Sequence, residues 1–248
     1  MSNTYTPHLY LLIDPDKNYR DNDWLNRIDI LKAHPPSGFL IGGSTMEQDH
    51  SAEIINRLRL HFDLPIIAFP GDLGQVTDHF DRIFLLSLLS GRNPEYLVEQ
   101  HVRWASDLWP YRHKMIPTAY LLIDGGNRSS VSRVSQTAPL DPAHNIAILN
   151  HCKAAQMMGF AQIYLEAGSG AMHSVPSSLV EQVKQTIDLP LIVGGGITSS
   201  KQIAELLNAG ADTLVIGNGF EKSPQRWPEW RQTWAEISRN YNRRALKA

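Results

Sequence analysis

Short apolar runs alternate with longer segments of helical period along most of the chain. A continuous apolar run is typical of a strand buried in a parallel sheet, whereas apolar residues every three or four positions indicate a helix. The predicted strands are residues 9–13, 39–41, 64–69, 82–89, 119–123, 160–165, 191–193 and 213–216. The predicted helices are residues 23–33, 47–61, 93–108, 143–158, 176–187, 200–209 and 226–248. This alternation predicts an α/β fold, a closed (β/α)8 TIM barrel, forming one domain over residues 1–248.

One unit departs from the alternation. Residues 74–80, after the third predicted strand, have weak periodicity and are poor for a helix, so the third barrel helix is expected to be reduced or missing. Residues 128–142 are rich in Ser and Thr and are expected to form a long functional loop. The length of 248 residues matches the ~250 typical of this fold.

Composition narrows the classes of function. A net charge of −2 gives no support for general nucleic-acid binding. The only cysteine, Cys152, lies in an apolar helical pattern and is expected in the core, and it cannot form a disulfide within the chain. Neither a signal peptide nor a membrane-spanning run is recognisable, so a cytoplasmic location is expected. The basic end of the last predicted helix suits a solvated face, with peripheral membrane contact as the alternative.

Two glycine-rich turns follow the last two predicted strands. They are Gly194-Gly195-Gly196 and Gly217-Asn218-Gly219. In a TIM barrel this rim frequently holds a phosphate on backbone N–H groups. The alternative is that the glycines serve only tight turns.

Polar side chains follow five of the other predicted strands and share the same rim. They are Asp14, Ser44, Asp72, Asp124 and Glu166. No Cys/His cluster has zinc spacing, no nucleophile elbow is present, and no lysine ends a strand. Carboxylates beside phosphate cradles suit Mg²⁺ and a carboxylate general base. Glu166 directly precedes a Gly-Ser-Gly turn, which places a base beside a phosphate grip, unless Glu166 only stabilises that turn.

Five motifs carry a family resemblance: LIDPDK, IGGST, YLEAGSGA, IVGGGI and GADTLVIGN. In this order and spacing, from about residue 9 to residue 221, the chain resembles the geranylgeranylglyceryl phosphate synthase family, whose bacterial relatives include heptaprenylglyceryl phosphate synthases. The YLEAGSG form is similar to the larger subgroup, which implies a homo-oligomer, a dimer or a hexamer. Leu12 stands where some members of the smaller subgroup carry a lysine that contacts glycerol phosphate.

The resemblance implies a Mg²⁺-dependent prenyltransferase. It would join sn-glycerol 1-phosphate to a long allylic prenyl diphosphate, with geranylgeranyl diphosphate expected, and release pyrophosphate. Asp14 and Ser44 match the metal-binding positions, and Glu166, Asp14 and Tyr164 are the expected catalytic residues. The positions that match the phosphate-binding set are Tyr164, Leu165, Glu166, Ala167, Gly168, Ser169, Gly170, Gly194, Gly195, Gly196, Gly217 and Asn218.

Two other functions remain open from the sequence. One is an isomerase or cyclase barrel of the histidine-biosynthesis type, which would use Asp14 and Asp124. The other is a phosphate-binding barrel that has lost catalysis and serves as a binding subunit. The sequence does not specify the prenyl length, and Trp104 and Trp109 are candidates for blocking the prenyl groove, for anchoring an interface, or for ordinary core packing.

Overall fold

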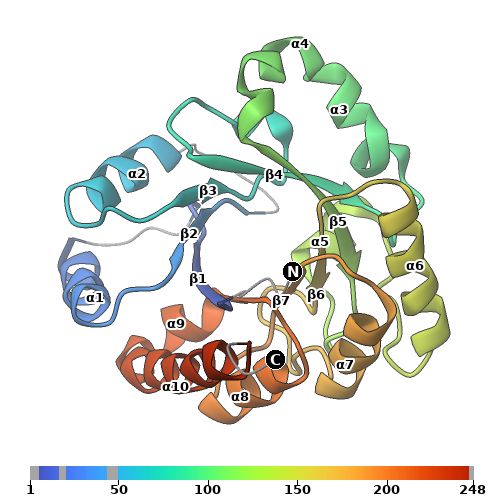
Figure 1. The fold of residues 1–248 in the computed structure, drawn as a ribbon. Helices are drawn as coiled ribbons and strands as arrows, with labels where there is room; N and C mark the ends of the chain where they lie inside the picture. The colour runs from blue at the N-terminus through green and yellow to red at the C-terminus, as the bar shows by residue number, and fades with distance from the viewer. Residues whose placement is uncertain (1–5, 17–20, 44–49, 246–248) are drawn as a thin grey trace.

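The computed structural model describes residues 6–16, 21–43 and 50–245, which form a closed barrel of eight parallel strands (Figure 1). Each strand pairs with the next, and β8 pairs with β1. The strands are β1 His8–Ile13, β2 Gly38–Ile41, β3 Ile66–Ala68, β4 Arg82–Leu88, β5 Met115–Leu122, β6 Gln162–Glu166, β7 Leu191–Gly194 and β8 Thr213–Ile216. The predicted barrel and all eight predicted strands are confirmed.

Helices surround the barrel on the outside (Figure 1). The α-helices are α1 Asp21–Ala33, α2 Ser51–Arg59, α3 Gln100–Arg103, α4 Ala105–Leu108, α5 Ser130–Ser135, α6 Asn145–Met157, α7 Ser177–Thr186, α8 Ser200–Asn208, α9 Asn218–Lys222 and α10 Trp227–Ala245. Three 3₁₀ segments, η1 Leu73–Gln75, η3 Trp109–Lys114 and η4 Pro224–Arg226, and one π-helical turn, η2 Glu95–Glu99, complete the described elements. None of the helices described is long and apolar enough to cross a bilayer.

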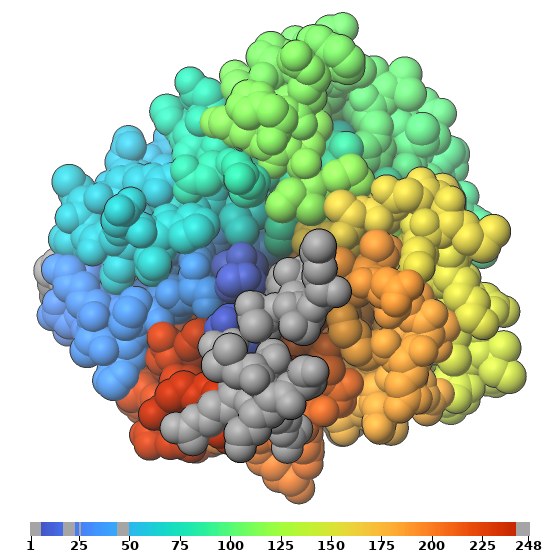
Figure 2. All heavy atoms as spheres, in the orientation of Figure 1, coloured from blue at the N-terminus to red at the C-terminus, as the bar shows by residue number. Residues whose placement is uncertain are grey.

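The last helix closes the ring of elements. With all heavy atoms drawn, the red C-terminal helix lies next to the blue N-terminal elements (Figure 2). Trp227 Nε1 donates to His34 O at 2.7 Å, and Arg231 Nε donates to Pro35 O at 2.6 Å. Trp227 and Trp230 are fully buried, as the amphipathic pattern predicts. The side chains beyond Tyr241, including most of the predicted basic end, lie outside the described part.

Side chains alternate between two apolar layers along each strand. On β6, Ile163 and Leu165 pack in the core between the strands and the helices, whereas Tyr164 packs in the cluster inside the barrel. Because side chains two residues apart share a face of a strand, Glu166 points inward like Tyr164. Cys152 lies on the buried face of α6 in the same outer core, as predicted. Burial raises the pKa of its thiol to about 12, so this cysteine is not a nucleophile at neutral pH.

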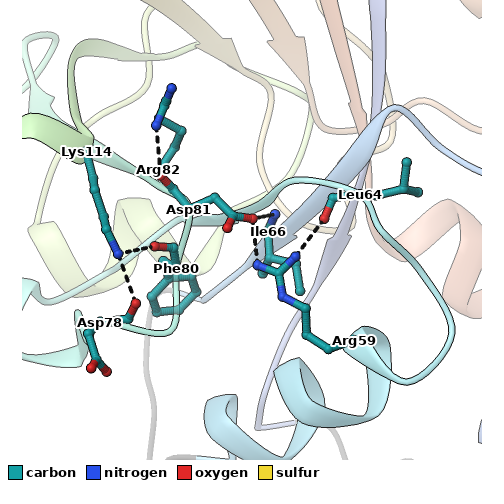
Figure 3. A network of polar contacts seen from close by, with 8 residues as sticks. All are labelled: Arg59, Leu64, Ile66, Asp78, Phe80, Asp81, Arg82 and Lys114. Carbon is teal, nitrogen blue, oxygen red and sulfur yellow. Dashed lines mark hydrogen bonds and ion pairs between the residues drawn. The ribbon is translucent and has the colours of Figure 1, made fainter.

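The connection from β3 to β4 lacks a helix, as predicted, and contains only η1. Polar contacts hold it in place instead (Figure 3). The Asp81 carboxylate accepts from Arg59 at 2.6 Å and from the Ile66 N–H at 2.8 Å. Lys114 donates to the carbonyl oxygens of Asp78 and Phe80 at 2.9 Å and 2.8 Å. These bonds fasten the end of the crossing that enters β4 to the barrel.

The predicted helix over residues 93–108 is wrong in detail, because it is broken into η2, α3 and α4. A π-turn adds a residue to one turn and rotates everything that follows it. Gln100 is therefore buried, while Val98 and Val102, which a regular apolar period would place on the inner face, are 49% and 67% exposed. In α6, Ile146 is exposed, whereas Ile148, Cys152 and Ala155 are buried and form the inner face.

Two short helices were not predicted. The first, α5, lies inside the expected loop of residues 128–142; the Ser129 hydroxyl caps it by accepting from the Ser132 N–H, and Gln136 ends it at φ 55°. The second, α9, begins at Asn218, directly after β8. Both lie beside the rim where the predicted functional residues gather.

We predict that Asp81→Asn destabilises the fold by about 1 kcal/mol, because it weakens a charge-assisted hydrogen bond whose partners are partly exposed. Burial raises the pKa of Asp81, but the hydrogen bonds from Arg59 and Ile66 outweigh it and leave the pKa lowered. The stabilisation is therefore present above the unfolded-state pKa and is lost as pH falls through the folded-state pKa.

Thermal unfolding of wild type, Asp81→Asn and Asp78→Asn checks this prediction. Asp78 uses its backbone oxygen for Lys114 and its side chain is 71% exposed, so Asp78→Asn is a matched control that should leave Tm unchanged. The gap between wild type and Asp81→Asn should be clear at pH 7 and should shrink below about pH 4. Equal Tm values at pH 7 would show that the carboxylate does not hold this crossing.

Candidate functional site

A hollow opens at the carboxyl ends of the strands, with about 990 Å³ of empty space that is open to solvent. It brings together most of the predicted site. The predicted residues that line it are Asp14, Tyr164, Glu166, Gly168, Ser169, Gly170, Gly195, Gly196, Gly217 and Asn218. Leu165 and Ala167 do not line it, since their side chains pack in the outer core, and Ser44 lies outside the described residues. We call this space the phosphate hollow.

Glu166 ends β6 at the base of the phosphate hollow and is only 6% exposed. Its Oε1 accepts from the Gly168 N–H at 2.7 Å. The next strand approaches so closely that glycine is needed there: a Cβ on Gly195 would lie 2.5 Å from Oε1, and one on Gly194 would overlap the Tyr164 hydroxyl. The glycines of the fourth motif, IVGGGI, thus make room for the Glu166 carboxylate as well as forming a turn.

The surroundings of Glu166 set its protonation. Burial raises the pKa of Glu166 to about 7, although the Gly168 N–H and the Tyr164 hydroxyl act in the opposite direction. Burial and the neighbouring Glu166 raise the pKa values of Tyr120 and Tyr164 well above the ordinary value, so both hydroxyls stay protonated. A carboxylate that gains and loses a proton near neutral pH, in a cleft, has the properties of a general base.

The glycine turns after β6, β7 and β8 form a cradle that lines the phosphate hollow. Gly168, Gly170, Gly195 and Gly196 have φ values of 103°, 73°, 81° and 68°, which other residues adopt only with strain. The Ser169 hydroxyl lies 3.2 Å from Asn218 Oδ1, and this contact ties the loop after β6 to the start of α9. Backbone N–H groups at turns and helix starts favour an anion, so the predicted phosphate cradle has a suitable geometry.

Sequence reasoning missed Lys222, which also lines the phosphate hollow. It lies four residues after Asn218 on α9, one helical turn further along, and adds a cation beside the cradle. The signal was available in principle, because a helix that starts at Asn218 places Lys222 on the same face as Asn218. It was overlooked because the glycine turn after β8 was not expected to open a helix.

Asp14 follows β1 on the same rim, and its Oδ1 accepts from the Asp16 N–H at 3.1 Å. Within the part of the chain that the structure describes, no three His, Cys, Asp or Glu side chains form a metal-binding group. Mg²⁺ suits such a sparse site, because it takes one or two carboxylates and completes its shell with water and substrate phosphate oxygens. The Asp14 carboxylate, in an open hollow beside a phosphate cradle, therefore fits the predicted metal.

A second hollow of about 650 Å³ adjoins the first, and we call it the apolar groove. It shares Gly43, Phe69, Tyr120 and Val131 with the phosphate hollow. Its other lining residues are Pro70, Gly71, Leu73, Leu86, Leu88, Tyr96, Gln100, His101, Val134 and Ser135. None of the described residues that line it is acidic or basic apart from His101, and burial lowers the pKa of His101, which keeps the ring neutral at pH 7. The groove suits a long uncharged chain.

An aromatic cluster forms the wall between the two hollows. The Tyr120 and Tyr164 rings stack with centroids 5.4 Å apart, and Phe69 lies 5.3 Å from Tyr164. Phe69 and Tyr120 line both hollows, and Tyr164 lies beside Glu166. The carboxylate is therefore at the point where the phosphate hollow meets the apolar groove.

Two candidates lie elsewhere. Asp124 accepts from the Gly126 N–H at 2.9 Å and lines a separate surface hollow with Asn127 and Gln136, so the structure does not bring it together with Asp14. Trp109 is 66% exposed and blocks nothing, whereas Trp104 lies over Gly74, where a Cβ would be 2.7 Å from its Cζ2. Asp72 caps η1 by accepting from the Gly74 N–H and lies outside both hollows.

Comparisons with known proteins agree with this site. The model of the PcrB family matches residues 3–232. The chain is 42% identical to the geranylgeranylglyceryl phosphate synthase of Zunongwangia profunda, over 86% of this chain and 90% of that one. It is 41% identical to the protein of that name from Flavobacterium johnsoniae, over 86% and 87% of the two chains.

Solved structures give the same result. The (S)-3-O-geranylgeranylglyceryl phosphate synthase of Thermoplasma acidophilum, in complex with its substrate sn-glycerol-1-phosphate, has a TM-score of 0.83 and 32% identity, covering 93% of this chain and 92% of that one. The N-acetylmannosamine-6-phosphate 2-epimerase of Clostridium perfringens, at 14% identity and a TM-score of 0.55, shares the barrel fold alone. The chain therefore belongs to the PcrB family, together with these geranylgeranylglyceryl phosphate synthases.

Proposed function

We propose that this protein is a prenyltransferase that joins sn-glycerol 1-phosphate to a long allylic prenyl diphosphate, such as geranylgeranyl diphosphate, and releases pyrophosphate. The observation that carries the proposal is the position of Glu166, a buried carboxylate where a phosphate cradle meets an uncharged apolar groove. The names of the relatives and the substrate bound in the Thermoplasma acidophilum structure support it.

The phosphate hollow takes the acceptor. The phosphate of sn-glycerol 1-phosphate lies against the glycine turns, the start of α9 and Lys222. That placement leaves the short glycerol chain to extend toward Glu166, at the base of the same hollow. Holding the hydroxyl beside a base and beside the carbon that it attacks removes much of the entropic barrier to the reaction.

Glu166 takes the proton of the acceptor hydroxyl. As the glycerol oxygen bonds to C1 of the prenyl chain, the bond from C1 to the diphosphate oxygen breaks, and pyrophosphate leaves with the electron pair. With a pKa of about 7, Glu166 is ionised in a large share of molecules at neutral pH and is basic enough to accept this proton.

Asp14, with Ser44 from outside the described residues, would hold Mg²⁺. The bound ion would neutralise charge on the departing diphosphate. The Asp14 carboxylate lies against Gly43, in the turn after β2, where a Cβ would be 2.9 Å from its Oδ1, whereas the glycine cradle follows β6 to β8. The two ends of the phosphate hollow thus serve two different phosphate groups.

The apolar groove takes the prenyl chain. Its uncharged lining keeps water away from the allylic carbon, which gains positive charge as the diphosphate leaves. The faces of Phe69, Tyr120 and Tyr164 border the junction and attract a cationic centre. Tyr120 and Tyr164 suit this position because both hydroxyls stay protonated, whereas phenolates would compete with the acceptor hydroxyl as nucleophiles.

The alternatives explain less of the site. An isomerase or cyclase of the histidine-biosynthesis type would need Asp14 and Asp124 in one site, but Asp124 lines a separate surface hollow. A non-catalytic binding subunit would need the phosphate cradle but not the buried carboxylate at its base. The groove also has no role in either alternative.

The proposed function is tested by incubating purified protein with sn-glycerol 1-phosphate, Mg²⁺ and geranylgeranyl diphosphate. We expect equal amounts of pyrophosphate and of an ether that extracts into organic solvent. Replacing the acceptor by its mirror image, sn-glycerol 3-phosphate, provides a matched control for recognition of the glycerol carbon. Absence of any ether across prenyl diphosphates of several lengths would overturn the proposal.

We predict that Glu166→Gln lowers kcat by about 10²- to 10⁴-fold, because it removes the base. The glutamine oxygen can still accept from the Gly168 N–H, so the circular dichroism spectrum and the KM for sn-glycerol 1-phosphate should change little. Glu181→Gln, at an exposed position on α7, is the matched control and should behave as wild type. Turnover of Glu166→Gln close to that of wild type would mean that Glu166 only supports the turn.

A further inference from the structure

The outer end of the apolar groove is built on the connection that lacks a helix. Phe69 and Tyr120 line both hollows and so mark the inner end, next to the chemistry. Leu73 and Gln100 line the groove but not the phosphate hollow, so they lie away from the junction, and we call their part of the groove its outer end. Leu73 belongs to η1, and its side chain is 3% exposed. One wall of the outer groove is therefore a three-residue turn with no helix behind it.

Gln100 joins that turn to the opposite wall. It is the first residue of α3, it is 7% exposed, and its Oε1 accepts from the Leu73 N–H at 3.3 Å. Hydrogen bonds from Arg103 and, with a smaller effect, from Gln100 lower the pKa of the Glu95 carboxylate. Glu95 is held by Arg103 through two bonds of 2.7 Å. Gln100 is thus oriented by the π-turn before it and reaches across the groove to η1.

Trp104 packs closely against η1, beside Gln100. A Cβ on Gly74 would lie 2.7 Å from the Trp104 ring, so the indole of Trp104 rests directly on the backbone of η1. The Nε1 of Trp104 is buried without a hydrogen-bond partner, so this contact is one of shape alone. The Gln100 amide therefore makes a directional hydrogen bond to η1, beside the apolar contact that Trp104 makes with the same turn.

We propose that Gln100 is a positioning residue that determines which prenyl lengths the groove accepts, by holding the Leu73 wall against α3. The inference rests on the proposed function and deepens it. Without an acceptor, the buried Leu73 N–H gains by moving toward water, which draws η1 outward and opens the outer end. Only a chain long enough to reach that end benefits from the change, so selectivity for length shifts while the chemistry at Glu166 does not.

The test is a competition between two allylic diphosphates, the twenty-carbon geranylgeranyl and the thirty-five-carbon heptaprenyl compound, for limiting sn-glycerol 1-phosphate. Wild type is compared with Gln100→Met, which keeps the size of the side chain and removes its acceptor. Glu99→Gln, at the neighbouring exposed position, is the matched control. We expect the ratio of long to short product to rise about fivefold in Gln100→Met, as the loss of one buried hydrogen bond implies.

The kinetic constants separate positioning from general damage. In Gln100→Met, KM for the prenyl diphosphate should change, while KM for sn-glycerol 1-phosphate should stay within about twofold of the wild-type value, since the acceptor hollow does not contain Gln100. Should Gln100→Met not fold, Gln100→Asn serves, because it withdraws the amide by one methylene. It should shift the product ratio in the same direction.

The outcomes are distinct. A wild-type protein that makes no ether from either diphosphate overturns the proposed function and this inference with it. A wild type that makes ether, with the same product ratio in the folded Gln100 variant, overturns this inference alone. A shift of equal size in Glu99→Gln also overturns it, because the effect would then belong to the whole segment and not to the Gln100 amide.

Discussion

The site depends on the burial of one carboxylate against a neighbouring strand that has no side chains at the point of contact. Glu166 lies inside the barrel mouth because it is two residues after Tyr164 on β6, and β7 can approach because Gly194 and Gly195 stand opposite. The turn that follows, Gly195 and Gly196, lines the phosphate hollow. Burial, which would be a cost for a purely structural glutamate, here gives the pKa of a base that works near neutral pH.

The two hollows follow from this arrangement. The strands from β6 to β8 end in glycine turns and make the polar side, and the connection without a helix, between β3 and β4, leaves room for the apolar side. A full helix after β3 would pack where the groove runs. Polar bonds from Arg59 and Lys114 hold the end of a segment that has no helix to pack against the barrel.

Much of this was predictable from the sequence, for physical reasons that can be named. Buried parallel strands are continuous apolar runs, so the eight strands and the barrel followed from the pattern. The missing helix was visible because residues 74–80 lack a helical period. Glu166 and the glycine turns were recognisable because a barrel places the ends of all strands on one rim.

Other features depend on contacts that a local pattern does not contain. The rotation caused by the π-turn at Glu95–Glu99 exposes Val98 and buries Gln100, against the apolar periodicity. The cap of α5 rests on a single serine, Ser129, in a segment of low helical propensity. Asp124 looked equivalent to Asp14 by its position after a strand, but the two residues line different hollows.

The most direct test of the central claim is the pH dependence of kcat/KM for ether formation. The pKa of Glu166 is raised, so the free enzyme should lose activity below about pH 7 as this base becomes protonated. The second ionisation of the acceptor phosphate, near pH 6, is common to wild type and variant and is measured separately with Glu166→Gln. The account predicts an acidic limb near pH 7 that is present in wild type and absent from the residual activity of Glu166→Gln. A limb that is the same in both proteins, or no limb near pH 7 in wild type, would contradict it.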